Sequence, residues 1–411
     1  MLLTLLKNEW QHYKILPDKA RRLILSFNLW SIAQPILSLF LNAYIWRTTV
    51  SVVAVAMYNL GFVIALPFGF FVNGKLLKKF HVTQTYFFGL FLSMLGAVSV
   101  VFFHSSVWYH LLSYGLVYGF GAGIYWASRN YLTFSQTNTE VRNYFFSIVS
   151  MAGSVIDIVV SFSIGWIIAF ADISHLYTPF LAYACITIFA LVSIFFAGTI
   201  LLNSGFNTPV IDKIWQPFIS RRWNLVRIAN VAIGVWGGMS SLVSTLLILH
   251  FLGKEGILGT IGAVVSAFTI CLYYLYGRLA KQHHRGSVLL TALLATVPLG
   301  ILLILSKGTL PVLIYVLLAG LPISFYSLTF DPWLLDVMDK ELSNHHHEKY
   351  FLIFDCEVFL NIGRAIGLAV FIFLALKFSG EFALKLSPLL LSVLQIIIFA
   401  SIWKKIKWDG N

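Results

Sequence analysis

Long apolar runs separated by short polar intervals follow one another along the whole chain. Most runs reach the about 20 residues that a membrane-spanning helix needs, and they lack the period-two alternation of β-barrel strands. The pattern therefore predicts an all-α integral membrane protein. Twelve transmembrane helices are expected, at residues 22–46, 50–72, 83–104, 107–133, 144–169, 175–202, 224–252, 256–277, 286–306, 309–335, 350–376 and 384–403.

The run at residues 350–376 is unusual because it carries charged side chains inside an apolar sequence, among them Asp355. At 100° per residue, Glu357, Asn361 and Arg364 share one helix face. A charge near the bilayer centre costs at least about 2.5–3.5 kcal/mol, so this face must meet the protein interior or a wet cavity. Two interpretations stay open: a buried ion pair that joins two helices, or a site for substrate and coupling ion.

The two halves of the chain resemble each other at an offset of about 205 residues. Gly74 opens the loop GKLLK after the second predicted helix, and Gly277 opens GRLAK after the eighth. Six spans per half is an even number, so both halves insert in the same orientation, as parallel repeats. The expected division is a tail at 1–21, a six-helix bundle at 22–203, a linker at 204–223, a second six-helix bundle at 224–403 and a tail at 404–411.

Composition and charge support a membrane protein. Of the 411 residues, 59% are hydrophobic and 11% are charged, against roughly 25% charged in soluble domains. The net charge of +12 comes mainly from Lys and Arg in the tails, the linker and every second loop. This is the positive-inside pattern, which argues against nucleic acid as a partner. It places both termini and the linker in the cytoplasm, with the chain in the inner (plasma) membrane. Residues 1–22 show no cleaved signal peptide.

Together these features resemble the major facilitator superfamily: six plus six helices, cytoplasmic termini, a polar linker and a repeated Gly–basic loop. The resemblance implies that helices one, four, seven and ten line a central cavity, while three, six, nine and twelve face lipid. Lys78 and Lys281 match a loop position where the family usually has an acid, and we assign both to gating. Gly115 stands where many proton-coupled members carry an arginine, so no sub-family is indicated.

Helix five carries one carboxylate near its centre, Asp157, on a face of small and hydroxyl side chains. The repeat places Asp157 and Arg364 at nearly the same membrane depth. In the fold that the chain resembles, helices five and eleven flank the cavity from opposite halves. We expect Asp157 to carry the coupling proton, with Glu357 as the next candidate. Arg364 and Asn361 are expected to bind substrate, with Asp157 as an alternative partner of the arginine.

Helices one and four each have a polar face. Tyr114, Tyr118 and Tyr125 follow one face of helix four, where their hydroxyls could line a wet path; packing beside the glycines of this helix is the alternative. Helix one has Asn28 and Gln34 on a polar face, which we assign to the cavity. The alternative for these amides is hydrogen bonding between helices, at about 0.6 kcal/mol each.

A second charged pair is expected near the cytoplasmic ends of helices four and ten. Arg129 closes the polar face of helix four, and Asp331 precedes Pro332, which should end helix ten. We assign Arg129 and Asp331 to gating, with a solvated helix end as the alternative for Asp331.

The sequence thus predicts a secondary active transporter that moves a small organic solute, anionic or amphipathic, by alternating access. A proton is the expected coupling ion, because a carboxylic acid in low dielectric binds protons near neutral pH. An exporter or flippase of an amphipathic or lipid-like molecule or drug is one alternative, and a non-transporting receptor is another. No enzyme motif, metal site or cofactor site is apparent. The expected partners are the solute, the coupling ion and membrane lipids, with a monomeric chain.

Overall fold

The protein is all helical in the computed structural model, which describes residues 16–136, 139–208, 211, 214–215, 220–279, 285–305, 308–345 and 349–403. Two π-helical turns, η1 and η2, continue the first and seventh membrane helices. The helices are α2 (Asp18–Pro35), η1 (Ile36–Phe40), α3 (Leu41–Thr49), α4 (Val52–Leu76), α5 (Val82–Phe103), α6 (Trp108–Gln136), α7 (Thr139–Ser174), α8 (Pro179–Leu202), α9 (Arg221–Leu247), η2 (Ile248–Leu252), α10 (Glu255–Leu279), α11 (Arg285–Ile304), α12 (Thr309–His345), α13 (Lys349–Lys377) and α14 (Gly380–Trp403).

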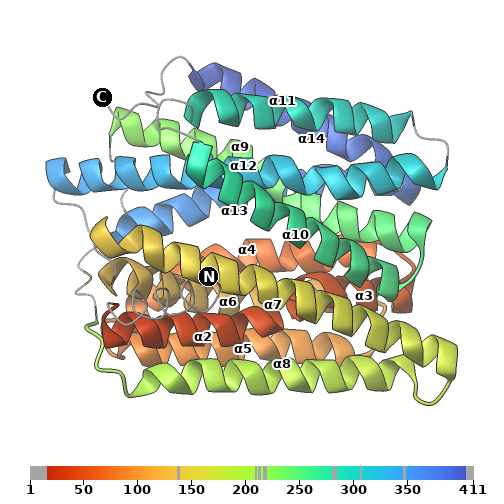
Figure 1. The fold of residues 1–411 in the computed structure, drawn as a ribbon, viewed down its shortest axis with the longest axis horizontal. Coiled ribbons are helices and arrows are strands. Elements are labelled where there is room, and N and C mark those ends of the chain that lie inside the picture. Colours follow the sequence, from red (N-terminus) through yellow and green to blue (C-terminus); the bar gives the residue numbers. More distant parts are fainter. Residues whose placement is uncertain are drawn as a thin grey trace, which may run out of the picture.

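The helices form two bundles, α2 to α8 in the lower half of Figure 1 and α9 to α14 in the upper half. With α2–η1–α3 and α9–η2 each taken as one helix, the described part has the twelve long helices that the sequence predicts. Their bounds agree with the prediction to within five residues, except in helix ten. Pro332 was expected to end that helix, and this was wrong: α12 continues to His345.

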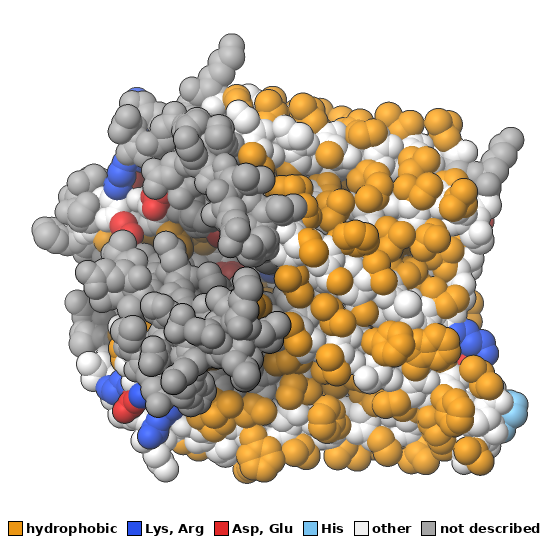
Figure 2. Space-filling view, viewed as in Figure 1, with side chains coloured by type: hydrophobic (Ala, Val, Ile, Leu, Met, Phe, Trp, Pro, Cys, Tyr) orange, Lys and Arg blue, Asp and Glu red, His pale blue; other side chains and the backbone are white. Residues whose placement is uncertain are grey.

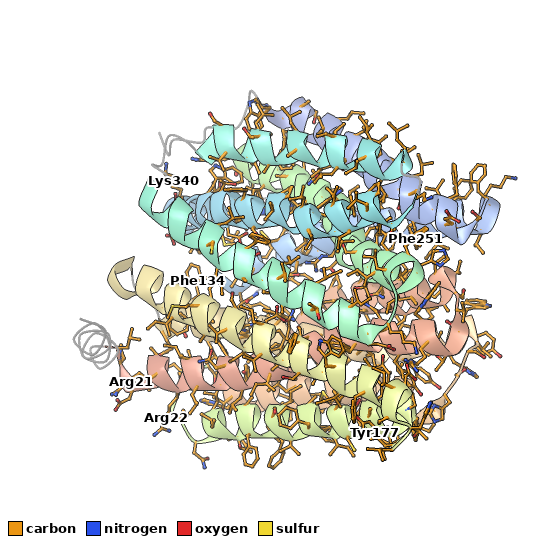
Figure 3. The ribbon with its side chains drawn as sticks, turned by 45° about the vertical axis from the view of Figure 1, so that its right-hand side comes forward. Arg21, Arg22, Phe134, Tyr177, Phe251 and Lys340 are labelled. Atoms are coloured by element: carbon orange, nitrogen blue, oxygen red, sulfur yellow. The ribbon has the colours of Figure 1, made fainter. Side chains whose placement is uncertain are left out.

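α2 begins and α14 ends at the same side of the molecule, where residues 203–220 connect α8 to α9 (Figure 1). We call this side the linker end and the opposite side the far end. Figure 3 shows Arg21, Arg22 and Lys340 toward the linker end and Tyr177 and Phe251 toward the far end. An even number of crossings in each bundle gives this arrangement.

The outer surface between these ends is apolar, as Figure 2 shows for one face. Ten helices of the described part are long and apolar enough to span a membrane. α5, α8, α11 and α14, the third, sixth, ninth and twelfth membrane helices, each expose several large apolar side chains, as expected for lipid-facing helices. They include Phe88, Phe91, Phe189, Phe196, Leu294, Ile301, Leu390 and Ile397.

Glycines set the closest helix crossings. Gly115, Gly119 and Gly123 follow one another at four-residue spacing on α6, where a Cβ would lie 2.0–2.1 Å from backbone oxygens of α4. On α9, a Cβ at Gly234 would lie 2.1 Å from a backbone oxygen of α13, and one at Gly238 would lie 2.6 Å from an α13 Cα atom. Only residues without a side chain permit these approaches, which bring α6 against α4 in the first bundle and α9 against α13 in the second.

Candidate functional site

A cavity of about 350 Å³, here called the central cavity, lies between the two bundles. The first bundle contributes α4 and α6, and the second contributes α9 and α13. α6 and α9 are the fourth and seventh membrane helices, as the resemblance predicted, whereas α4 and α13 are the second and eleventh. The first and tenth helices, which were also expected, contribute none of the described lining residues. The described residues that line it are Asn59, Phe62, Val63, Leu66, Trp126, Gly237, Gly238, Glu357 and Arg364.

The polar row predicted on helix eleven forms one wall of this cavity. Arg364 Nη1 donates to Asn361 Oδ1 at 3.2 Å, and Asn361 Nδ2 donates to Glu357 Oε2, also at 3.2 Å. Asn361 therefore stands between the guanidinium and the carboxylate. Among the described residues, no carboxylate oxygen comes within the 4.0 Å of an ion pair with Arg364.

An arginine carries five N–H donors and keeps its charge in proteins. In the described part of the chain, Arg364 places this charge beside the cavity with Asn361 as its hydrogen-bond acceptor. Such a wall can bind an oxyanion through two parallel N–H bonds.

An asparagine that the sequence did not single out, Asn59, lines the same cavity as Arg364 from the opposite bundle. Asn59 of α4 donates to Asn42 Oδ1 at 2.8 Å, and Asn42 Nδ2 donates to the Ser38 carbonyl at 2.8 Å. Asn42, on the polar face of the first membrane helix, thus orients Asn59, a cavity residue of the neighbouring α4. Asn28 is half-buried with an unpartnered Oδ1 among the described residues, and Gln34 is exposed; neither belongs to the described lining.

Asp157 lies in the contact between α7 and α10, which belong to opposite bundles. Its carboxylate accepts hydrogen bonds from Ser161 Oγ at 3.3 Å and from Ser266 Oγ of α10. In the described part of the chain it forms no ion pair with Arg364. The alternative pairing of Asp157 with Arg364 is thus not formed among the described residues, and two hydroxyl groups bind the Asp157 carboxylate.

The tyrosines of helix four pack behind the cavity wall. Tyr118 stacks on Phe62 with ring centroids 4.7 Å apart, and Tyr125 contacts Trp126 at 5.4 Å. Phe62 and Trp126 are the rings that line the cavity. Tyr114 packs on Phe103 at 6.2 Å, nearer the far end. These three side chains therefore pack between helices, which was the alternative to lining the cavity directly.

Arg129 has aromatic neighbours in place of the carboxylate that the sequence suggested. Its guanidinium carbon lies 4.3 Å from the Phe27 ring centroid, 4.5 Å from Trp126 and 5.0 Å from Trp30. These distances are typical of cation–π contacts. Asp331 is exposed on α12, and no ion pair joins it to Arg129 among the described residues.

A charged network that the sequence did not reveal joins the bundles at the far end. Arg47 of the first bundle binds Asp172 at 2.7 and 3.1 Å and Glu255 at 2.7 and 2.9 Å. Glu255 belongs to α10 of the second bundle and also accepts from Tyr183 at 2.9 Å. Lys254, beside it, pairs with Asp172 at 3.2 Å. We call these five residues the far-end network.

Other contacts across the bundles surround this network. The Trp46 and His250 rings meet at 5.7 Å, and Trp166 Nε1 donates to Thr260 at 3.1 Å. A sequence signal existed, because Asp172 and Glu255 are acids at helix ends on the side where cations are few. These acids can share a cation only if membrane helices five and eight lie side by side, and sequence periodicity does not predict which helices are neighbours.

The linker end has its own contact between the bundles. Tyr350 of α13 donates its hydroxyl to the Phe70 carbonyl of α4 at 2.6 Å and accepts from Asn73 Nδ2 at 3.3 Å. A Cβ at Gly74, the glycine of the repeated loop, would lie 3.0 Å from the Tyr350 ring. Lys78 is exposed in the following turn. Lys281 lies outside the described residues.

Asp355, the remaining acid of helix eleven, finds its partner inside the second bundle. Arg227 of α9 donates to both of its oxygens, at 2.7 and 2.8 Å, and Trp223 Nε1 donates at 2.6 Å. Asp355 is fully buried. This ion pair joins two helices of one bundle. Of the two interpretations of the charged run, the buried ion pair therefore applies to Asp355.

The match to a known family agrees with this geometry. A family model described as "Major Facilitator Superfamily" matches residues 23–368. The chain belongs to the major facilitator superfamily. Its helices therefore form the membrane-spanning transporter fold of that superfamily. Among the described residues, no three His, Cys, Asp or Glu side chains are grouped to hold a metal ion.

Two bacterial proteins are similar in sequence. YqgE of Bacillus subtilis (strain 168), described as uncharacterized, is 24% identical over 379 residues, which are 90% of this chain and 86% of YqgE. A Geobacillus stearothermophilus protein, described as an uncharacterized protein in the sodM 3′ region, is 31% identical over 130 residues. These are 32% of this chain and 61% of that protein.

Solved transporters share the fold. A bacterial homologue of the iron transporter ferroportin, in an inward-facing state, superposes with a TM-score of 0.68 at 15% identity, over 96% of this chain and 99% of that one. In an outward-facing state the TM-score is 0.60 at 16% identity, over 95% and 100%. The peptide transporter POT in complex with alafosfalin gives 0.63 at 12% identity, over 95% and 96%.

Proposed function

We propose that this protein is a secondary active transporter that binds a small organic anion in the central cavity and moves it by alternating access. Arg364 carries the proposal: it lines the cavity between the bundles and has no carboxylate partner among the described residues. A charge held at membrane depth is costly unless it is compensated. A substrate carboxylate or phosphate compensates it, because a guanidinium binds planar oxyanions bidentately.

Alternating access requires contacts between the bundles that break in turn. The far-end network and the Tyr350 contacts lie on opposite sides of the central cavity and suit this role. The basic residues of the linker end support a cytoplasmic position for that end, and on this orientation we assign the far-end network to closing the outer side.

The proposal also includes coupling of transport to protons, with Asp157 as the group that carries the proton. Asp157 sits where α7 and α10 meet, and its hydroxyl partners come from both bundles. When the bundles move, Ser266 leaves and the carboxylate meets water, which changes its proton affinity. Glu357, already on the cavity wall, is the second candidate for carrying the proton.

A binding screen followed by transport tests this function. Purified protein is titrated with a panel of small organic anions, cations and neutral compounds at constant pH and ionic strength. An anion that stabilises the protein is then supplied to proteoliposomes with an imposed pH gradient. Uptake should accelerate when the gradient is present and fall when a protonophore collapses it. Stabilisation by cations or neutral compounds alone would refute the anion site, and gradient-independent uptake would refute the coupling.

A further inference from the structure

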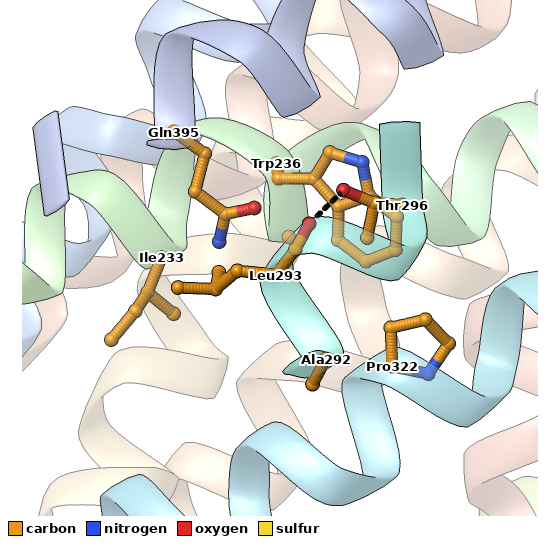
Figure 4. A pocket seen from close by; sticks show the side chains of 8 residues that line it. Ile233, Trp236, Ala292, Leu293, Thr296, Pro322 and Gln395 are labelled. Atoms are coloured by element: carbon orange, nitrogen blue, oxygen red, sulfur yellow. Dashed lines mark hydrogen bonds between the residues drawn. The ribbon is translucent and has the colours of Figure 1, made fainter. Parts of the chain in front are cut away.

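A second cavity lies inside the second bundle, separate from the interface between bundles. It has a volume of about 60 Å³ and is lined by residues of α9, α11, α12 and α14. We call it the bundle pocket (Figure 4). Its described lining residues are Ile233, Trp236, Gly237, Ala292, Leu293, Thr296, Pro322 and Gln395. The volume exceeds the roughly 10–15 Å³ that one water needs, but it has room for a small group only.

Two buried polar atoms in this lining lack partners. The indole N–H of Trp236 and the side-chain oxygen of Gln395 have no hydrogen-bond partner among the described residues, although the residues are 6% and 3% exposed. Buried polar groups are nearly always satisfied in native proteins. Thr296 forms no hydrogen bond with either atom, and its hydroxyl donates to the Leu293 carbonyl at 2.7 Å, as Figure 4 shows. One donor and one acceptor are thus left for an occupant.

Gly237 belongs to the linings of both the bundle pocket and the central cavity. A Cβ at Gly237 would meet nothing within 4 Å, so α9 presents bare backbone to open space here. The next residue, Gly238, packs directly on the backbone of Arg364. The backbone of α9 at Gly237 is therefore part of the wall of both cavities, and no side chain of this residue stands between them.

We propose that the bundle pocket receives the tail of the transported anion. The anionic group binds Arg364 in the central cavity, a short apolar body passes Gly237, and a terminal hydroxyl meets Trp236 and Gln395. A hydroxyl fits because it accepts from the indole N–H and donates to the amide oxygen at the same time. The substrate class is therefore a short ω-hydroxylated organic acid, an inference that rests on the proposed function.

Three probes of one series test this assignment: acetate, hexanoate and 6-hydroxyhexanoate. Their dissociation constants are measured by titration calorimetry on the purified full-length protein. Hexanoate should bind more tightly than acetate, and 6-hydroxyhexanoate should bind about 5- to 10-fold more tightly than hexanoate because it satisfies two buried groups. Equal affinity of all three would overturn the inference while leaving the anion site intact.

Variants separate the tail site from the anion site. Gly237→Leu should block the passage, so that all three probes bind as weakly as acetate, and Gly237→Ala should give an intermediate effect. Trp236→Phe should remove only the preference for the hydroxyl, which keeps the test valid if the leucine variant does not fold. A hydroxyl preference that survives both variants would overturn the inference. No binding of any of the three probes would overturn the inference and leave other anions to test the proposed function. Acetate binding that survives Arg364→Gln would instead defeat the proposed function and the inference with it.

Discussion

Arg47→Gln is the sharpest perturbation of the proposed outer gate. Arg47 is the hub of the far-end network: it belongs to the first bundle and holds Asp172 and Glu255 at four N–O distances of 2.7–3.1 Å. Glu255 of the second bundle is nearly inaccessible, with its side chain 3% exposed. A glutamine at position 47 leaves these acids without their shared cation. The conformation with a closed far end should therefore lose stability relative to the open one.

The size of this loss follows from burial. Removing one partner of a fully buried ion pair costs about 3–5 kcal/mol. The Arg47 and Asp172 side chains are 27% and 16% exposed, and Lys254 and Tyr183 remain in contact with the two acids. A loss of about 2–3 kcal/mol is therefore expected. Since 1.4 kcal/mol is a factor of ten in an equilibrium constant, the open population should rise about 30- to 150-fold.

A cysteine in the central cavity reports this population. Val63→Cys places the thiol in the lining, in a background where the exposed Cys185 and Cys271 are serine and the buried Cys356 is kept. A membrane-impermeant maleimide is added to intact cells, and the labelling rate is measured. Ser106→Cys, in the loop between α5 and α6, verifies that the far end faces the reagent.

Lys385→Gln is the matched control, because Lys385 also lies near the far end but pairs with Glu381 on its own helix at 2.8 Å. Such a pair contributes about 0.3–0.5 kcal/mol and does not cross the bundles. Labelling should rise strongly with Arg47→Gln and change less than about threefold with Lys385→Gln. If both variants label at the wild-type rate, the far-end network does not hold the outer side closed.

Three further substitutions address coupling, bundle stability and helix packing. Asp157→Asn should abolish accumulation driven by the pH gradient in proteoliposomes and leave exchange intact; surviving accumulation would assign the proton to another group. Asp355→Ala should lower the unfolding free energy in detergent by about 3–5 kcal/mol, and adding Arg227→Met should restore most of it. Gly115→Ala should reduce thermal stability, because its Cβ would lie 2.0 Å from an α4 oxygen, whereas Gly237→Ala should leave stability unchanged.

Much of the fold was accessible from the sequence because membrane helices have a strong signal. Long apolar runs set the helix positions, and cations set the alternation of loops. Helix ten shows the limit: Pro332 lies inside α12, which continues to His345. A proline removes one backbone donor, and the surrounding helix is retained here, so residue type alone did not decide the boundary.

The site was only partly accessible for a related reason. The row of Glu357, Asn361 and Arg364 depends on one helix and followed from periodicity. Asn59 and the far-end network depend on which helices meet, and this is set by glycine contacts such as those of Gly238 on α13. The tyrosines of α6 had the right spacing for a cavity, yet neighbouring rings occupy that place. Periodicity gives the face of a helix but not the identity of its neighbour.

The central claim is that Arg364 binds the transported anion, and a neutral double variant tests it most directly. Acetate binding and anion transport are measured for wild type, Arg364→Lys, Arg364→Gln and Arg364→Gln with Glu357→Gln. The account predicts that Arg364→Lys folds and binds about 10- to 100-fold more weakly, because lysine lacks the bidentate fork. It further predicts that the double variant regains stability but neither binds nor transports. Transport restored in the double variant would show that Arg364 only balances the charge of Glu357, and would contradict the account.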